Sequence, residues 1–427
     1  MYIPKPDGSE RPLGIAAQRD KIVQASILNH LEPVLEEVFL DCSYGFRRGR
    51  NCHNALKAIK TKWQSIIWII SIDISKYFDT VHHPVLLNMV SQYCDQPTTE
   101  LIAKMLKVGY MDMANLSDSI ERTKLGIPQG SLISPILANL YLHSLDCYVV
   151  NVLLEEWNRG DERKFISGYQ TRKALSSEEK SLVGKLELPG LEDAIAKLKH
   201  NAWIKNGLPS RDPHDIAFRR LRYVRYTDDF ILGFTGKKEE AIAIKNNIEQ
   251  FLADGLKLKV NENKSKIFHS SDRNIKYLGF FLRYINTNKI VKDPKGENGD
   301  IIQQLKSTAI NSTQLRIPVE ELLQRAVERG YAKLRKDGES YRATSCRKLA
   351  SLLDKDIVDR FSGIIRGLVQ YYSASNQYSD LWQVISIYRK SCALTLADKH
   401  KLKTAAKAFK TYGPRLRISD SLAPKKT

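Results

Sequence analysis

The 427-residue chain is 42% hydrophobic and 9% aromatic, a composition typical of a folded protein, and its length favours two or three domains. Its 67 Lys and Arg exceed its 48 Asp and Glu and give a net charge of +19, which favours a nucleic-acid partner, although contact with the ribosome or an anionic membrane would also explain the charge. Because the six cysteines form no C-x-x-C pair and no apolar run reaches about 18 residues, the sequence argues against a zinc ribbon, a disulfide framework and a membrane span.

The first predicted elements are a hairpin, a helix and a strand. The opening segment "MYIPKPDGSERPLGI" predicts a β-hairpin, because its Asp-Gly step favours a tight turn. Residues 51–63 predict a helix with Asn51 as N-cap. The next run, "SIIWIISIDIS", predicts a strand in which Ser71 and Asp73 share one face and the apolar side chains share the other. Asp73 is therefore expected on the more polar face, near the end of the strand.

A turn followed by a helix is predicted over residues 125–146, "LGIPQGSLISPILANLYLHSLD". Ser134 is the expected N-cap, and Pro135 then occupies the first helical position. The apolar stripe of this helix is expected to consist of Leu137, Leu140, Tyr141 and Leu145.

Changes in composition indicate how the chain is organised. Residues 155–220 are charged and irregular and are predicted to be an insertion. Residues 286–317 begin with a polar stretch typical of a linker, and from Pro318 onward the pattern is helical and more basic. We therefore expect one domain over 1–285 and a second over 318–427.

The run "RYVRYTDDFILGF" (222–234) places two acidic residues within a strand-like apolar pattern. An isolated Asp-Asp pair is usually a solvated turn, but these flanks are too apolar for an ordinary exposed loop. If the strands that carry Asp73 and Asp228 are neighbours in one sheet, their carboxylates supply the oxygen ligands that two Mg²⁺ ions need for phosphoryl transfer. We therefore predict that Asp73 and Asp228 are metal ligands, and that Asp229 lies at the hairpin turn and supports the metal site.

Seven motifs in a fixed order give the chain a family resemblance. They are "IPKPDGSERPLGI", "SYGFRRGRNCHNAL", "SIDISKYFDTVHH", "GIPQGSLISPILANLYL", "RYVRYTDDFILGF", "LKLKVNENKSKI" and "IKYLGFFL". Together they resemble the group II intron-encoded reverse transcriptases, or maturases, over nearly the whole chain. The resemblance implies an α+β right-hand polymerase fold with fingers and palm, followed by an all-α thumb that also serves as the maturase domain (domain X).

The resemblance also implies roles for individual residues. The family's catalytic carboxylates match Asp73, Asp228 and Asp229. The dNTP site would include Lys5 and Arg11 on the triphosphate, Phe78 under the sugar and Gln129 at the template-primer junction. A ring at Phe78 would clash with a 2′-OH and favour dNTPs over NTPs. Without the resemblance, these four residues are equally explained as surface charges, a core ring and a helix-capping turn.

Basic residues are the expected nucleic-acid contacts. Arg47, Arg48 and Arg50 are predicted to contact the template backbone, with a solvated basic loop as the alternative. Residues 331–427 hold 20 Lys and Arg against 8 Asp and Glu. The intron RNA contacts predicted there are Arg366, Lys401, Lys403 and Lys407. Tyr371, Tyr372 and Tyr378 could stack on unpaired bases, and we expect at least one of them to be buried in the core.

The resemblance predicts a Mg²⁺-dependent RNA-directed DNA polymerase that also promotes splicing and mobility of its host intron. Its partners would be group II intron RNA, an RNA template with a DNA primer, and dNTPs; a homodimer is left open. The alternatives are a catalytically silent RNA-binding splicing cofactor and another reverse transcriptase such as a retron enzyme.

Three departures from the family bear on these expectations. "YTDD" replaces the commoner "YADD", the family's zinc-containing endonuclease module is absent, and its earlier N-terminal segments do not precede Met1. The insertion resembles that of the organellar branch, and there is no presequence. We therefore expect synthesis inside a mitochondrion, with a plastid or bacterial cytoplasm as alternatives.

Overall fold

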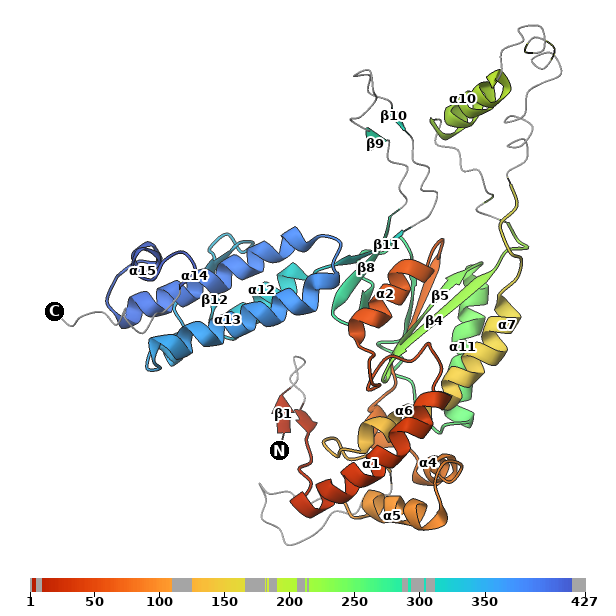
Figure 1. Ribbon diagram of the computed structural model, residues 1–427, viewed down its shortest axis with the longest axis horizontal. Helices are drawn as coiled ribbons and strands as arrows, with labels where there is room; N and C mark the ends of the chain where they lie inside the picture. The colour runs from red at the N-terminus through yellow and green to blue at the C-terminus, as the bar shows by residue number, and fades with distance from the viewer. Residues whose placement is uncertain are drawn as a thin grey trace. The chain divides into compact units, whose positions relative to one another are not determined.

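The computed structural model describes residues 2–4, 10–109, 125–165, 181, 183, 190–205, 212, 215–285, 291–292, 303–304 and 312–416. Contacts divide the chain into two compact units, the first made of Met1–Asp272 with Tyr284–Thr313 and the second of Arg273–Arg283 with Gln314–Thr427. Both units combine helices with antiparallel strands, as the predicted α+β class requires (Figure 1). The predicted domain bounds of 1–285 and 318–427 stay a prediction.

A four-stranded antiparallel sheet is the centre of the first unit. Its strand order is β4-β5-β3-β6. The strands are β3 (Trp68–Ile72), β4 (Arg220–Tyr226), β5 (Asp229–Thr235) and β6 (Lys266–His269). The strand predicted from "SIIWIISIDIS" is therefore confirmed, and it lies in the middle of the sheet with β5 on one side and β6 on the other.

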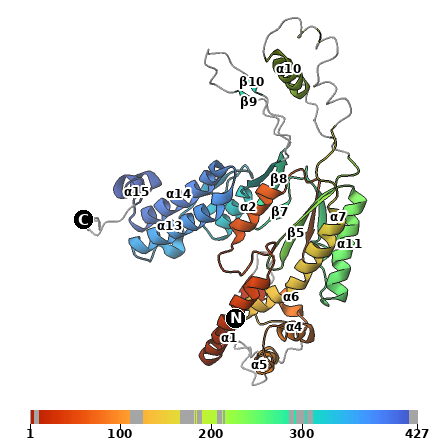
Figure 2. The same ribbon diagram turned by 45° about the vertical axis from the view of Figure 1, so that its right-hand side comes forward.

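Helices cover both faces of this sheet. Figures 1 and 2 show α2 on one side and α7 with α11 on the other. The helices of the first unit are α1 (Gln18–Val38), α2 (Cys52–Lys62), α3 (Tyr77–Thr80), α4 (His83–Val90), α5 (Gln96–Lys107), α6 (Ser134–Tyr148), α7 (Leu154–Trp157), α10 (Leu191–Lys205) and α11 (Lys238–Asp254), and a π-helical turn (Val149–Leu153) joins α6 to α7. Asn51 caps α2 as predicted, accepting a 3.0 Å bond from the backbone N–H of Asn54.

The N-terminal hairpin is also confirmed. β1 (Tyr2–Pro4) pairs antiparallel with β2 (Glu10–Pro12), with Ile3 opposite Arg11. The Asp-Gly turn predicted to join these strands lies outside the described residues. A second short pair joins β9 (Val291–Lys292) to β10 (Gln303–Gln304).

Helix α6 is the core helix of the first unit. Its predicted stripe of Leu137, Leu140, Tyr141 and Leu145 is at most 2% exposed, and the residues between them are buried as well. The predicted N-cap is wrong by one position: the helix begins at Ser134 after Ile133, and the Ser134 hydroxyl instead donates to the Pro128 carbonyl at 2.7 Å. By length and composition, the helical run Ser134–Trp157 could span a membrane, but 61% of its most apolar window is buried inside the protein. Such burial is typical of a core helix.

The second unit is mainly helical, as predicted for the region after Pro318. Its helices are α12 (Val319–Glu328), α13 (Asp354–Tyr371), α14 (Leu381–Lys399) and α15 (Ala405–Tyr412). A hairpin of β12 (Ala332–Leu334) and β13 (Tyr341–Ala343), which the sequence pattern did not reveal, follows α12. A further sheet has the order β11-β8-β7, and the division between the units falls within β8 (Phe280–Ile285) and β11 (Ser312–Arg316), whereas β7 (Lys276–Tyr277) belongs to the second unit.

One carboxylate connects three helices of the second unit. Asp354, at the start of α13, lies 2.7 Å from Lys399 Nζ at the end of α14 and 2.8 Å from His400 Nε2, and it accepts a 3.0 Å bond from the Tyr412 hydroxyl of α15. Burial alone would raise the pKa of Asp354, but the hydrogen bonds from these three groups outweigh it and hold the pKa below the usual value.

Asp354→Asn is therefore expected to destabilise the second unit by about 2 kcal/mol at neutral pH, because it removes charge-assisted hydrogen bonds. A carboxylate with a depressed folded-state pKa stabilises the fold above its unfolded-state pKa, and this contribution disappears as the pH falls through the folded-state value. Urea unfolding of the full chain should thus separate wild type from Asp354→Asn at pH 7 and bring them together in acid. Asp356→Asn, which changes an exposed carboxylate of the same helical turn, is the matched control; an equal loss in both variants would contradict the assignment.

Candidate active site

Three carboxylates gather at one end of the central sheet. Strand β3 pairs with β5 so that Ile72 lies opposite Phe230, which makes Asp73 and Asp229 the next opposing positions beyond the ladder. The turn that joins β4 to β5 contains Asp228 and lies at the same end. Residues from two distant parts of the sequence are therefore neighbours, as the sequence analysis expected for Asp73 and Asp228.

The β4–β5 turn differs by one position from its prediction. Tyr226 pairs with Asp229, so the two turn residues are Thr227 and Asp228, and Asp229 is the first residue of β5. The prediction that Asp229 lies in the turn is wrong because Thr227 takes a positive φ of 60°, which lets the hairpin close early. A positive φ at the first central position is the arrangement of type II′ hairpin turns.

The electrostatics of the three carboxylates are unbalanced. Asp229 is exposed to solvent, yet desolvation by surrounding protein atoms, followed by repulsion from Asp228 and Asp73, raises its pKa to about 6. The nearby cation, Lys264, acts in the opposite direction and lies 3.9 Å from Asp73 Oδ2. The site therefore carries more negative charge than Lys264 neutralises, and a cation would relieve the repulsion.

The donor set fits magnesium in an open site. Mg²⁺ prefers oxygen ligands and is commonly held by one or two carboxylates together with substrate phosphates. Within the part of the chain that the structure describes, no three or more His, Cys, Asp or Glu side chains converge closely enough to hold a metal ion by themselves. Asp73 and Asp228 thus fit a site that substrate oxygens would complete, and their assignment as metal ligands stays a prediction.

Two predicted dNTP contacts lie on neighbouring segments. Phe78 is half-buried, its ring packs edge-on against Tyr77 at 5.4 Å, and its carbonyl accepts a 2.6 Å bond from Ile127 N–H. Gln129 follows on the same loop, and its carbonyl accepts a 2.7 Å bond from Gly14 N–H. Lys5 and the side chain of Arg11 lie outside the described residues. The roles of all four stay predictions.

Arg47 is a correction to the predicted template contacts. It is 6% exposed, and its guanidinium donates to the Glu36 carboxylate at 2.7 Å and to the carbonyls of Leu40 and Ser43. Because its donors are consumed inside the protein, Arg47 holds α1 against the loop that follows it and is not available to a phosphate.

The other two arginines of this loop differ in exposure. Arg50 is half-buried, pairs with Asp41 at 2.7 Å and lies 5.6 Å above the ring of Tyr44. Arg48 is exposed. Both stay predicted template contacts, and Arg48 is the more accessible of the two.

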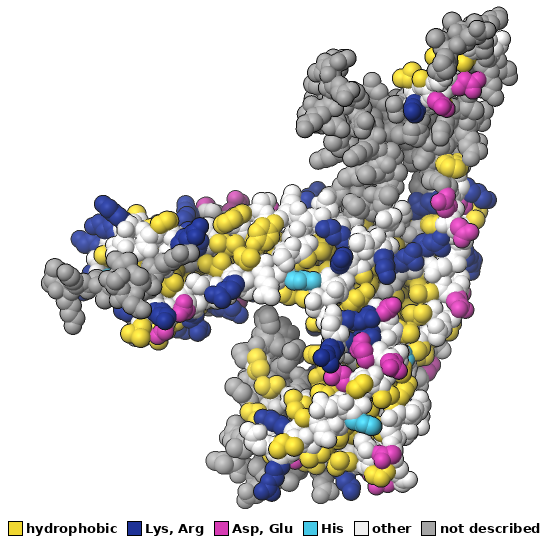
Figure 3. All heavy atoms as spheres, viewed as in Figure 1, with side chains coloured by type: hydrophobic (Ala, Val, Ile, Leu, Met, Phe, Trp, Pro, Cys, Tyr) yellow, Lys and Arg dark blue, Asp and Glu magenta, His cyan; other side chains and the backbone are white. Residues whose placement is uncertain are grey.

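The basic residues predicted to bind RNA in the second unit are accessible. Arg366, Lys401, Lys403 and Lys407 are all exposed. Figure 3 shows numerous Lys and Arg side chains over the helices of this unit. Tyr372 is 4% exposed, which confirms that at least one of the tyrosines is buried, while Tyr371 is 37% exposed and its hydroxyl donates to the Leu278 carbonyl at 2.9 Å.

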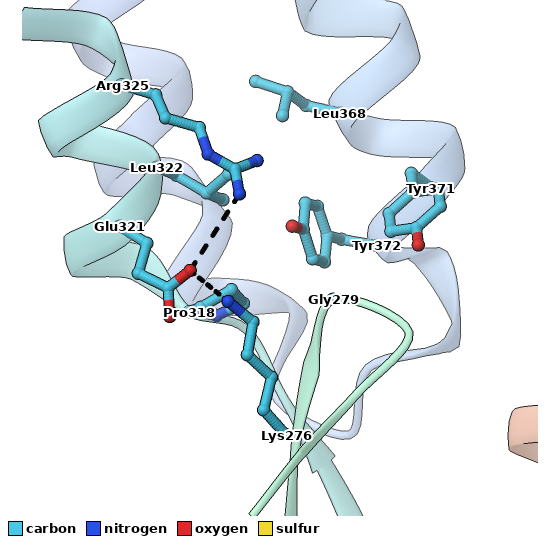
Figure 4. A pocket seen from close by; sticks show the side chains of 9 residues that line it. All are labelled: Lys276, Gly279, Pro318, Glu321, Leu322, Arg325, Leu368, Tyr371 and Tyr372. Atoms are coloured by element: carbon cyan, nitrogen blue, oxygen red, sulfur yellow. Dashed lines mark hydrogen bonds and ion pairs between the residues drawn. The ribbon is translucent and has the colours of Figure 1, made fainter. Parts of the chain in front are cut away.

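A cavity of about 350 Å³ lies within the second unit (Figure 4). It is lined by Lys276, Gly279, Pro318, Glu321, Leu322, Arg325, Leu368, Tyr371 and Tyr372. Glu321 of α12 extends between Lys276 Nζ at 2.5 Å and Arg325 Nη2 at 4.0 Å, and the two tyrosines extend from α13 on the other side (Figure 4). Aromatic rings beside cationic groups are suited to a nucleobase and its phosphate.

The sequence analysis missed a buried polar group beside the acidic turn. Arg225 and Asp146 are both fully buried and form an ion pair of 2.5 Å, and Asn139 is fully buried beside them. A signal was present, because Asn139 and Asp146 are seven residues apart and so share one face of the otherwise apolar helix α6. Polar residues on an apolar face usually have a buried partner.

Comparisons with known families match two adjoining regions. Residues 3–155 and 194–282 match the family described as "Reverse transcriptase (RNA-dependent DNA polymerase)". Residues 310–427 match the family described as "Type II intron maturase". The seven motifs of the sequence analysis lie within the first match, so the predicted resemblance and its right-hand polymerase fold class are confirmed.

Similar proteins include intron-encoded proteins of bacteria and fungal mitochondrial genes. The group II intron-encoded protein LtrA of Lactococcus lactis subsp. cremoris is 31% identical over 404 residues, covering 94% of this chain and 64% of that protein. The COX1/OXI3 intron 1 protein of Saccharomyces cerevisiae is 28% identical over 99% of this chain and 48% of its own length. A 91 kDa protein in the cob intron of Schizosaccharomyces pombe is 32% identical over 98% of this chain and 49% of its own length. The chain therefore spans between about half and two thirds of these relatives.

Solved structures similar to this chain include the telomerase of Candida tropicalis in complex with a fragment of telomeric RNA. It has a TM-score of 0.38 and 11% sequence identity, covering 96% of this chain and 54% of that one.

Proposed function

Because the chain belongs to the reverse transcriptase (RNA-dependent DNA polymerase) family, we propose that it is an RNA-directed DNA polymerase whose active site is the acidic end of the central sheet. The observation that carries the proposal is the convergence of Asp73, Asp228 and Asp229 from separate strands and a turn. The reaction is attack of a primer 3′-hydroxyl on the α-phosphate of a dNTP; the new bond is a phosphodiester, and pyrophosphate leaves.

Asp73 and Asp228 would hold Mg²⁺ in this site. When bound, a metal pair stabilises the attacking and the leaving oxygen of an in-line phosphoryl transfer. Asp229, first in β5, stands opposite Asp73 and keeps the negative charge of the site high. Phe78 is proposed to pack under the deoxyribose, Gln129 to contact the template-primer junction, and Lys5 with Arg11 to neutralise the triphosphate.

We further propose that the maturase-like region binds group II intron RNA and promotes its splicing and mobility. The match over residues 310–427, the excess of Lys and Arg after Tyr331 and the exposed lysines of α15 and the preceding loop support this proposal. The similarity to proteins of COX1 and cob introns supports synthesis in a mitochondrion.

A second candidate function is that of a splicing cofactor with a silent polymerase site. One observation favours it: among the described residues, no three acidic, histidine or cysteine side chains converge tightly enough to hold a metal ion without substrate.

Primer extension distinguishes the two functions. The full chain is incubated with Mg²⁺, dNTPs and a DNA primer on an RNA template, and binding to a group II intron RNA is measured in parallel against a length-matched unstructured RNA. Extension that EDTA abolishes supports the polymerase. Tight and selective binding of the intron RNA without any extension would replace the polymerase proposal by the cofactor.

Phe78→Val is expected to reduce the preference for dNTPs over NTPs by about tenfold or more, because the smaller side chain leaves room for a 2′-hydroxyl. Phe78 is half-buried at the edge of the core, so the variant should lose little stability. Single-nucleotide incorporation with dGTP and GTP measures the preference as a ratio of kcat/KM. Leu87→Val, which trims another half-buried side chain of the same core edge, should leave the ratio unchanged. An unchanged ratio in Phe78→Val would assign Phe78 to the core alone.

A further inference from the structure

A fully buried arginine makes a direct hydrogen bond to the turn that carries Asp228. Arg225, near the end of β4, is 0% exposed, and burying an unpaired guanidinium would be costly. Asp146 of α6 accepts both its Nε (2.7 Å) and its Nη2 (2.5 Å) in a bidentate pair. The remaining nitrogen, Nη1, donates to Asn139 Oδ1 at 3.1 Å and to the Thr227 carbonyl at 2.9 Å. One side chain thus connects the core helix to the acidic turn.

The residue that Arg225 holds has an unfavourable backbone conformation. Thr227 is β-branched, and a positive φ is a rare state for such a residue that costs about 1–3 kcal/mol unless the surroundings enforce it. Gly45 encloses the turn from the other side: a Cβ on Gly45 would lie 2.4 Å from both Thr227 N and Thr227 Oγ1. Only glycine therefore permits this close contact.

Asn139 connects the two constraints. Its Oδ1 accepts from Arg225, and its Nδ2 donates to the Gly45 carbonyl at 2.6 Å. Backbone bonds join the same segments, since Arg225 N–H donates to the Cys42 carbonyl and Tyr44 N–H donates to the Arg225 carbonyl, each at 2.9 Å. The turn is held between α6, strand β4 and the loop of residues 42–46.

We propose that Arg225, with Asp146 and Asn139, is a positioning network that fixes the Thr227 conformation and so aims the carboxylates of Asp228 and Asp229 toward Asp73. The inference rests on the proposed polymerase function and deepens it. The network touches neither substrate nor metal. A displacement of about 1 Å in a reacting group can cost on the order of 100-fold in rate, so a small shift of the turn would be measurable.

Arg225→Lys is the central test, because an ammonium can keep an ion pair with Asp146 but cannot reproduce the fork that also reaches Thr227. Single-turnover incorporation, measured well below the unfolding temperature of every variant, should show kcat reduced at least about tenfold with KM for dNTP nearly unchanged. Asn139→Ala, which removes the connection to Gly45 and keeps the ion pair, should act in the same direction and serves if Arg225→Lys does not fold.

The matched control is Thr235→Val at the opposite end of β5. Thr235 is 2% exposed and donates to the Ser65 carbonyl at 3.0 Å, so the isosteric variant loses a buried hydrogen bond far from the turn. It should lower the unfolding temperature while keeping kcat within about threefold. An equal loss of kcat in Thr235→Val, or no loss in Arg225→Lys and Asn139→Ala, would reduce the network to a stabilising role.

Binding of Mn²⁺, followed by electron paramagnetic resonance, separates failure of this inference from failure of the proposed function. Arg225→Lys should weaken Mn²⁺ binding relative to wild type and to Thr235→Val, whether or not the chain extends primers. Equal affinities in wild type and Arg225→Lys would overturn the positioning role. Equal affinities in wild type and Asp228→Asn would overturn the metal site itself, and with it the proposed polymerase function.

Discussion

Replacing Asp228 by asparagine is expected to lower the rate of dNTP incorporation by at least about 1,000-fold, the effect of losing about 4 kcal/mol of transition-state stabilisation from a displaced metal ion. Asparagine has the same shape as aspartate, and Asp228 is a half-buried turn residue. Removing its charge also relieves part of the repulsion on Asp229. The fold and the affinity for intron RNA should therefore be retained within a few fold.

Primer extension and filter binding on the same preparations measure the two properties. Asp254→Asn makes the same change at the exposed end of α11 and should leave both intact. Loss of extension together with loss of RNA binding in Asp228→Asn would indicate a folding role for the carboxylate. Full activity in Asp228→Asn would remove this residue from the metal site. Asp73→Asn combined with Asp228→Asn should cost little more than either change alone, because ligands of one site do not act additively.

The elements that were predicted correctly are those whose cause is local. The Asp-Gly hairpin, the cap of α2 at Asn51 and the alternation of β3 each depend on residues a few positions apart. The convergence of Asp73 with Asp228 was also predicted, but only as a condition on which strands are neighbours. The observed order β4-β5-β3-β6 supplies that condition.

The failures involve partners that are distant in sequence or absent from the local pattern. Arg47 has the local sequence of a solvated basic loop, but Glu36, eleven residues earlier on α1, makes it a buried structural residue. Arg225 looks like an ordinary polar position of a strand, and only the approach of Asp146, from a helix 79 residues away in the chain, explains its charge in the core. The position of the turn depended on Thr227 accepting a positive φ, which its own side chain disfavours.

Changing Lys401, Lys403 and Lys407 together to glutamine is expected to weaken binding of a group II intron RNA by about 100-fold at about 0.1 M salt, and far less near 1 M. The three side chains are exposed on α15 and the loop before it, so their removal should cost little folding energy. Each lost phosphate contact releases fewer counterions, and the slope of log affinity against log salt should become shallower by about two to three units.

The salt series distinguishes a local contact from a general effect of charge. Lys57, Lys60 and Lys62, which are exposed on α2 in the first unit, provide a control that removes the same number of charges from another surface. If only long-range attraction matters, both triple variants should lose affinity equally, because the net charge of +19 falls by the same amount in each. A larger change of slope in the Lys401, Lys403 and Lys407 variant would instead locate phosphate contacts on the maturase-like region. An unchanged slope there, with a reduced slope in the α2 variant, would move the RNA-binding surface to the polymerase unit.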